Sequence, residues 1–410
     1  MCIRDRSSNG KTGAGRRRWR CPGCGSSSVR RIDNSAKRLD MFLGWLLSRR
    51  TQADMGRSRA TFKRMTSEFW GIWPIARATG EVCDVVHLDG IWLGRRAVVL
   101  VARSPEHVLA WQLARSECSA AWAALMARVP APAMAVTDGG AGFAKAARAV
   151  WPRTRLQRCT FHAFCQVKRC TTSRPKLPCG QELYGIALRL LKVCDAGSAA
   201  AWLASYAEWH ARWERFLREF RIEDGRKRYV HERLRTARNG LDGLVRSGQL
   251  FTFVEMRQGH GGSWPSTNNC IESANAQLRA MLRDHRGLST VHEAKACFWW
   301  LLMHTECPPS AAEILRTMPR DEDVAGLFAA AAKRKSGGDG GDGYGCGIDW
   351  NEFPHANRVR AIAERPLIHF LSHNPPLKDM RVLGDDARAD PVKGTQSQRQ
   401  QQAKTCERGL

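Results

Sequence analysis

The stretch Val85-Val86-His87-Leu88-Asp89-Gly90 joins an apolar run to an acidic residue and a glycine. Its density of β-branched and apolar residues predicts a buried strand. A second stretch repeats the pattern, because apolar residues at 133–137 are followed by Asp138 and two glycines. Either aspartate alone fits an ordinary turn, since Asp-Gly is a common turn dipeptide. Two such aspartates at the ends of two strands predict a shared site that is rigidly held and open to solvent.

The segments around these aspartates follow a regular order. We expect strands over 82–93, 97–103 and 108–113, a helix over 120–129, a strand over 133–138, a helix over 143–151 and a strand over 155–161. Three strands followed by helix, strand, helix and strand are typical of a ribonuclease-H-like α/β core. In that sheet the two strands that end in Asp89 and Asp138 are neighbours.

A third acidic residue, Glu272, lies in a polar setting far along the chain. Residues 266–305 predict two helices, and Thr267 or Asn268 can cap the first. Glu272, Asn275 and Arg279 then share one helix face, which offers a carboxylate, an amide and a cation that can reach a phosphate. The helix dipole alone also favours a glutamate in a first turn. Together with Asp89 and Asp138, Glu272 can hold two Mg²⁺ or Mn²⁺ ions roughly 4 Å apart for phosphodiester chemistry.

Two cysteine motifs leave several interpretations open. Cys159 and His162 have spacing that fits zinc ligands, a Cys/His catalytic dyad, a support for the acidic site, or a buried thiol beside a hydrogen-bonded imidazole. Cys21 and Cys24 form half of a zinc ribbon, and two free thiols in a loop are the alternative. The missing pair belongs upstream, where only Cys2 stands, so we expect residues 1–8 to replace or truncate the natural start.

The charge of the chain predicts a polyanionic partner. It has 410 residues with 65 Lys and Arg against 39 Asp and Glu, a net charge of +26. Phosphate contacts with counterion release make nucleic acid the first candidate, ahead of a membrane surface, for which the chain has no basic amphipathic anchor. Residues 1–75 hold 17 basic and five acidic residues, and helical spacing within 36–73 predicts a helix-turn-helix. The side chains that we expect to bind DNA are Arg16, Arg17, Arg18, Arg57, Arg59, Lys63 and Arg64.

These patterns divide the chain into six regions. They are a partial zinc ribbon at 1–35, the helix-turn-helix at 36–80, the first part of the α/β core at 81–170, an all-helical insertion at 171–265, the remaining core helices at 266–332, and a linker with a disordered tail at 333–410. In the insertion, a stripe of aromatic residues keeps helical spacing and predicts the core of a helix bundle. Its members are Trp202, Tyr206, Trp209, Trp213, Phe216 and Phe220.

The chain carries no signal for export or for a membrane. Its N-terminus is charged and lacks an apolar region of the secretory kind, and no apolar stretch is long enough to span a bilayer. The 15 cysteines are odd in number and scattered, which is typical of a reducing compartment. We therefore expect a cytoplasmic, nucleoid-associated protein.

The order of these motifs resembles bacterial insertion-sequence transposases of the mutator-like DDE group. The resemblance covers roughly residues 10–355 and depends most on the order Asp89, Asp138, Cys159-x-x-His162, a long helical insertion and Glu272. The spacing of 134 positions from Asp138 to Glu272 matches a family whose core is interrupted by a helical domain. The first half of the zinc ribbon departs from the family, and so does the tail after about residue 356.

The resemblance implies a function and a role for each matching residue. Asp89, Asp138 and Glu272 would be the DDE triad that holds Mg²⁺ or Mn²⁺, while Cys159, His162, Asn275 and Arg279 would support it. The substrates would be the terminal inverted repeats of the element and a target DNA, and synapsis of two ends makes a homodimer or higher oligomer the expected assembly. Zinc would bind at the incomplete ribbon. The alternatives are an inactive element-derived DNA-binding protein or repressor, a nuclease or resolvase without strand transfer, and a Cys/His hydrolase.

Overall fold

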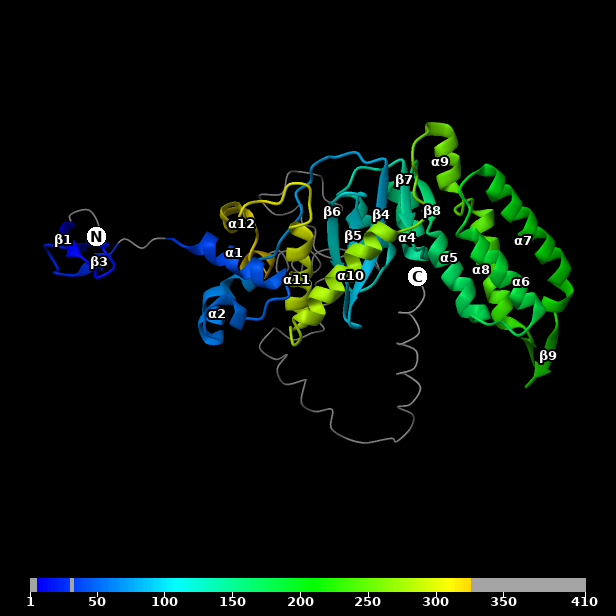
Figure 1. Ribbon diagram of the computed structural model, residues 1–410, viewed down its shortest axis with the longest axis horizontal. Coiled ribbons are helices and arrows are strands. Elements are labelled where there is room, and N and C mark those ends of the chain that lie inside the picture. The colour runs from blue at the N-terminus through cyan, green and yellow to red at the C-terminus, as the bar shows by residue number, and fades with distance from the viewer. Residues whose placement is uncertain (1–5, 30–32, 326–410) are drawn as a thin grey trace, which may run out of the picture. The chain divides into compact units, whose positions relative to one another are not determined.

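The computed structural model describes residues 6–29 and 33–325 of the chain (Figure 1). The linker and tail that we expect at 333–410 lie outside the described residues, as does Cys2. Within the described residues the fold is mixed α/β, with three separate sheets and helices between them. None of the described helices combines the length and the apolar character needed to cross a bilayer.

The N-terminal region holds a small sheet and two helices. The sheet is antiparallel, in the order β1 (Ser7–Lys11), β2 (Arg17–Arg20) and β3 (Ser27–Val29). The helical elements are α1 (Ser35–Leu46), η1 (Ala53–Met55), α2 (Arg59–Thr66) and η2 (Ser67–Gly71). Helix α2 begins where the Ser58 hydroxyl accepts a hydrogen bond from the Thr61 amide at 3.3 Å, which satisfies one of its free N–H groups.

The central sheet has five strands in the order β6-β5-β4-β7-β8. Strands β4 (Val85–Leu93), β5 (Ala97–Arg103) and β6 (Val108–Ala114) form an antiparallel meander. Strand β7 (Met134–Thr137) pairs with β4 in parallel, and β8 (Arg155–Arg158) pairs with β7 in parallel. The connecting helices are α3 (Ser119–Met126) and α4 (Ala141–Val150). Two crossovers through these helices give the parallel half of the sheet.

Alternating side chains divide the sheet between two apolar cores. Along β5, Val98, Leu100 and Ala102 pack in a cluster with α3 and α4, while Val99 and Val101 pack in a cluster with α1 and the late helices. This period of two is what a strand buried on both faces requires. The late helices are α10 (Asn269–Asp284), α11 (Thr290–Leu302) and α12 (Ala311–Thr317), and Figure 1 shows α10 beside β4.

The insertion contains α6 (Pro178–Leu190), α7 (Ala196–Leu217), α8 (Glu232–Arg246) and α9 (Thr252–His260). Helix α5 (Thr160–Thr171) precedes it and packs against α6 and α8. Trp202, Tyr206 and Trp209 are buried, as expected for a bundle core. The expectation of an all-helical segment is wrong at one place, where β9 (Phe220–Glu223) and β10 (Arg226–Tyr229) form a hairpin. Asp224 and Gly225 there adopt positive φ, as tight hairpin turns require, and Phe220 is exposed instead of continuing the aromatic stripe.

Candidate active site

The strand register places three of the expected site residues in one row. Leu88 of β4 pairs with Thr137 of β7, and Thr137 pairs with Arg158 of β8. Leu88 is followed by Asp89, Thr137 by Asp138, and Arg158 by Cys159. Neighbouring strands lie about 4.8 Å apart, so these three residues are adjacent at the carboxyl edge of the parallel strands.

Asp89 lies within its strand, which corrects the expectation that it ends one. Strand β4 continues to Leu93 because β5 pairs with it along its whole second half, whereas the pairing with β7 stops at Leu88. Asp89 Oδ1 accepts a hydrogen bond from the Gly90 amide at 2.8 Å, and Oδ2 accepts one from Asn275 Nδ2 at 2.6 Å. Burial, and next the charge of Asp138, raise the pKa of Asp89. A cation bound near the two carboxyl groups would therefore relieve their mutual repulsion.

Asp138 follows the last residue of β7 and lies beside the Arg158 guanidinium. The pKa of Asp138 is raised, chiefly by burial and also by the negative charge of Glu272. The positive charges of Arg158 and His162 oppose this shift. Gly139 has a φ of +90°, and a Cβ atom built on it would overlap Arg158 Nη1. The glycine after the aspartate is therefore required for the guanidinium to lie there.

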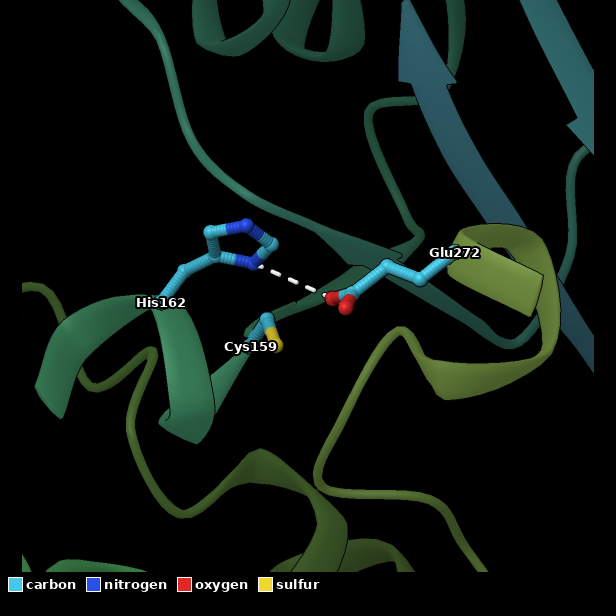
Figure 2. A group of neighbouring side chains, drawn as sticks. All are labelled: Cys159, His162 and Glu272. Carbon is cyan, nitrogen blue, oxygen red and sulfur yellow. Dashed lines mark ion pairs between the residues drawn. The ribbon is translucent and has the colours of Figure 1, made fainter. Parts of the chain in front are cut away.

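Cys159, His162 and Glu272 converge across the first turns of two helices (Figure 2). The expected strand over 155–161 ends at Arg158, and α5 begins at Thr160 because its amide donates to Ser266 O instead of extending the ladder. His162 therefore lies on a helix instead of at a strand end. Its Nδ1 lies 3.4 Å from Glu272 Oε1, and contact with the Cys159 thiol raises the pKa of His162. The sulfur, nitrogen and oxygen donors all lie within 4.8 Å of one another.

Buried polar atoms without a hydrogen-bond partner gather at this site. Within the described part of the chain, such atoms include His162 Nδ1, Glu272 Oε1, Asn275 Oδ1 and two nitrogens of Arg158. An unpaired buried polar atom costs about 1–3 kcal/mol, so folded proteins rarely leave several together. Their concentration around Asp89 and Asp138 indicates a place built to be completed by a ligand.

A buried network fixes the helix that carries Glu272. Asn268 is fully buried; its Nδ2 donates to Leu88 O at 3.0 Å, and its Oδ1 accepts from His87 Nδ1 at 2.9 Å. The amide orientation fixes the His87 tautomer, and burial lowers the pKa of this imidazole. The backbone N–H of Asn268 also donates a hydrogen bond to Cys159 Sγ at 3.4 Å. Asn268 is the N-cap residue, as expected, but its side chain makes no capping bond and binds β4 instead.

Two further residues belong to the site and were not expected there. Arg158 stands directly before Cys159, and its position at the carboxyl end of a strand was the available signal. Glu117 lies before α3 and accepts a hydrogen bond from Trp92 Nε1 at 2.7 Å. Burial raises the pKa of Glu117, and the negative charges of Asp138 and Asp89 raise it further. Glu117 is therefore a fourth carboxyl group that interacts electrostatically with the site. No local pattern at residue 117 signals this.

The other expected residues lie away from this cluster. Arg279 is exposed on α10, and the described residues give it no hydrogen bond or ion pair to the site. Cys21 is buried and Cys24 is exposed, and no third ligand joins them among the residues that the structure describes. The expected DNA-binding side chains are all exposed; they are Arg16, Arg17, Arg18, Arg57, Arg59, Lys63 and Arg64.

The donors at the site fit two kinds of metal ion. Oxygen ligands such as those of Asp89, Asp138 and Glu272 suit Mg²⁺ or Mn²⁺. The sulfur, nitrogen and oxygen set of Cys159, His162 and Glu272 suits Zn²⁺ instead. Glu272 belongs to both sets; its Oε1 accepts no hydrogen bond from the described residues and faces His162 Nδ1 at 3.4 Å.

We found no match to the chain among protein-family models or among curated proteins.

Proposed function

We propose that this chain is a DNA transposase that cleaves phosphodiester bonds at the ends of an insertion sequence and joins them to a target DNA. The observation that supports the proposal is the electrostatic influence of the three acids on one another: Asp138 raises the pKa of Asp89, and Glu272 raises the pKa of Asp138. The order of the sheet, β6-β5-β4-β7-β8 with β5 antiparallel to its neighbours, supports a ribonuclease-H-like core. The net charge of +26 supports a nucleic-acid substrate.

The residues of the site have distinct parts in this chemistry. Asp89 and Asp138 would hold divalent ions from the rigid sheet edge, and Glu272 would close the site from α10. Mg²⁺ bound there would stabilise both the attacking and the leaving oxygen of an in-line displacement. Asn275 orients the Asp89 carboxylate through its 2.6 Å hydrogen bond. Arg158 places a cation beside Asp138, where it can contact the phosphate of the DNA backbone.

The exposed basic side chains would bind the DNA away from the reacting bond. Arg57, Arg59, Lys63 and Arg64 belong to or flank α2, the expected recognition helix. Their contacts with phosphates would fix the register of the protein on the inverted repeats, and the recognition helix would read bases in the major groove. Binding and cleavage therefore depend on different residues.

Strand transfer distinguishes a transposase from a nuclease with the same site. A DNA fragment that carries a precut element end with a free 3′-OH should become joined to a supercoiled plasmid in the presence of Mg²⁺. We expect the joined product with the wild-type chain and none with Asp138→Asn, because the same carboxylates serve both steps. Cleavage without joining would assign a nuclease or resolvase, and binding without either reaction would assign an inactive DNA-binding protein.

A further inference from the structure

A second group of metal-ligand side chains lies on segments outside the candidate active site. Glu81 precedes β4, His107 occupies the turn between β5 and β6, and Glu306 follows α11. One donor atom from each of them lies within 4.8 Å of the other two. Glu81 and His107 are half-buried, and Glu306 is exposed. These segments are distant in sequence, so the fold alone brings them together.

The turn holds the His107 ring with one nitrogen toward the group. The His107 amide donates to Ser104 Oγ at 3.1 Å, and His107 O accepts from the Ser104 amide at 2.9 Å. In the ring, Nδ1 faces Ser104 Oγ at 3.4 Å, and Nε2 faces Glu81 Oε2 at 2.8 Å. Nε2 and Glu81 Oε2 lie at hydrogen-bond distance, so either a proton on Nε2 or a bound cation in its place can join the imidazole to the carboxylate.

We propose that Glu81, His107 and Glu306 bind a divalent transition-metal ion, with Zn²⁺ as the expected ligand. Imidazole nitrogen with carboxylate oxygens is a common zinc donor set, and the two carboxylates match the charge of the ion. Ligand distances of about 2.0–2.1 Å in a tetrahedral site separate the donor atoms by about 3.3 Å. His107 Nε2 and Glu81 Oε2, which lie 2.8 Å apart, would separate by about 0.5 Å to admit the ion, and the exposed Glu306 side chain would rotate to complete the site. The Ser104 hydroxyl would orient the ring, as hydrogen-bonding groups behind metal-bound histidines commonly do.

The ion would link the segment after α11, which carries Glu306, to the turn between β5 and β6, which carries His107. A backbone hydrogen bond of 2.8 Å from Val108 N to His304 O already joins these two segments. Helix α11 packs its Phe298 ring against Trp111 of β6, with ring centroids 5.9 Å apart. The metal site would therefore stabilise the end of the helical pair whose first member carries Glu272. This proposal does not rest on the proposed function and needs no DNA for its test.

The test is equilibrium dialysis of the full chain against micromolar Zn²⁺, with bound zinc measured by mass spectrometry and unfolding followed by calorimetry. Glu306→Gln removes one proposed ligand on an exposed side chain. The matched control is Glu106→Gln, which removes an exposed glutamate next to His107 in the turn between β5 and β6. We expect wild type and Glu106→Gln to bind about one zinc ion more per chain than Glu306→Gln and His107→Gln. Zinc should also raise the melting temperatures of wild type and Glu106→Gln by about 3 °C more than those of Glu306→Gln and His107→Gln.

Zinc held at other cysteines and histidines is common to all four proteins and cancels in the comparison. If Glu306→Gln binds as much zinc as the wild type, and zinc raises the melting temperature of both proteins equally, the proposal is wrong. The contact between Glu81 and His107 is then a hydrogen bond that needs no metal ion, and Glu306 has no part in it.

Discussion

Asp89→Asn should lower the rate of metal-dependent DNA cleavage by at least about 10³-fold, which corresponds to about 4 kcal/mol of transition-state stabilisation. The variant removes one negative charge from a half-buried position near Asp138 and weakens the binding of any divalent ion there. The fold should tolerate the change. The introduced asparagine can keep the bond from the Gly90 amide, and Asn275 can turn its unpaired Oδ1 toward the new amide group. Single-turnover cleavage of a labelled element end measures the effect.

The control for this prediction is Asp84→Asn, an exposed aspartate that precedes the same strand. It removes the same charge from the chain and should leave cleavage unchanged. DNA affinity should be equal for both variants and the wild type, since the expected DNA-binding side chains lie elsewhere. If Asp89→Asn cleaves at the wild-type rate, Asp89 is not a metal ligand and the assignment of the acidic triad is wrong.

Asn268→Leu should destabilise the protein by about 3 kcal/mol, because leucine of similar size leaves Leu88 O and His87 Nδ1 without partners in a buried place. The same change frees the first turn of α10 from β4, so Glu272 is no longer held opposite Asp138. We therefore expect cleavage to fall at least about 10-fold under conditions where the variant is fully folded. Urea denaturation gives the stability, and the cleavage assay gives the positioning effect.

Asn269→Leu provides the matched comparison, since Asn269 is the neighbouring residue and is exposed. An exposed substitution of this kind normally changes stability by less than about 0.5 kcal/mol. Equal stabilities for the two variants would contradict the role of Asn268. Loss of stability with unchanged cleavage per folded molecule would show that Asn268 supports the core but does not position Glu272.

Local sequence patterns were sufficient for the central part of the fold. The strands around Asp89 and Asp138 contain short, mostly apolar runs, and such runs are recognisable because burial on both faces demands them. Once the two strands are neighbours, the register brings the aspartates together without further information. The helix of Glu272 was also predictable from its spacing.

Features that depend on distant contacts could not be predicted in the same way. Arg158 ends the strand because the Thr160 amide donates to Ser266 O, 106 residues away. Asn268 serves β4 instead of its own helix, and Glu117 joins the site through Trp92. The hairpin at 220–229 replaces a helix that the aromatic spacing favoured. In the first three cases tertiary hydrogen bonds outweigh a local preference that is worth well below about 1 kcal/mol per residue. The hairpin is a local element, and its Asp224-Gly225 turn was the available signal.

The most direct test of the acidic triad is cleavage of DNA that carries the element's own flanking ends, with wild type beside Glu272→Gln and with Mg²⁺, Mn²⁺ or a chelator. We predict that wild type cuts at the ends only when a metal ion is present. Glu272→Gln should bind the same DNA without cutting it, because the neutral amide lacks the charge that closes the site from α10. Equal cleavage by both proteins, or binding without cleavage by the wild type, would contradict the proposed active site.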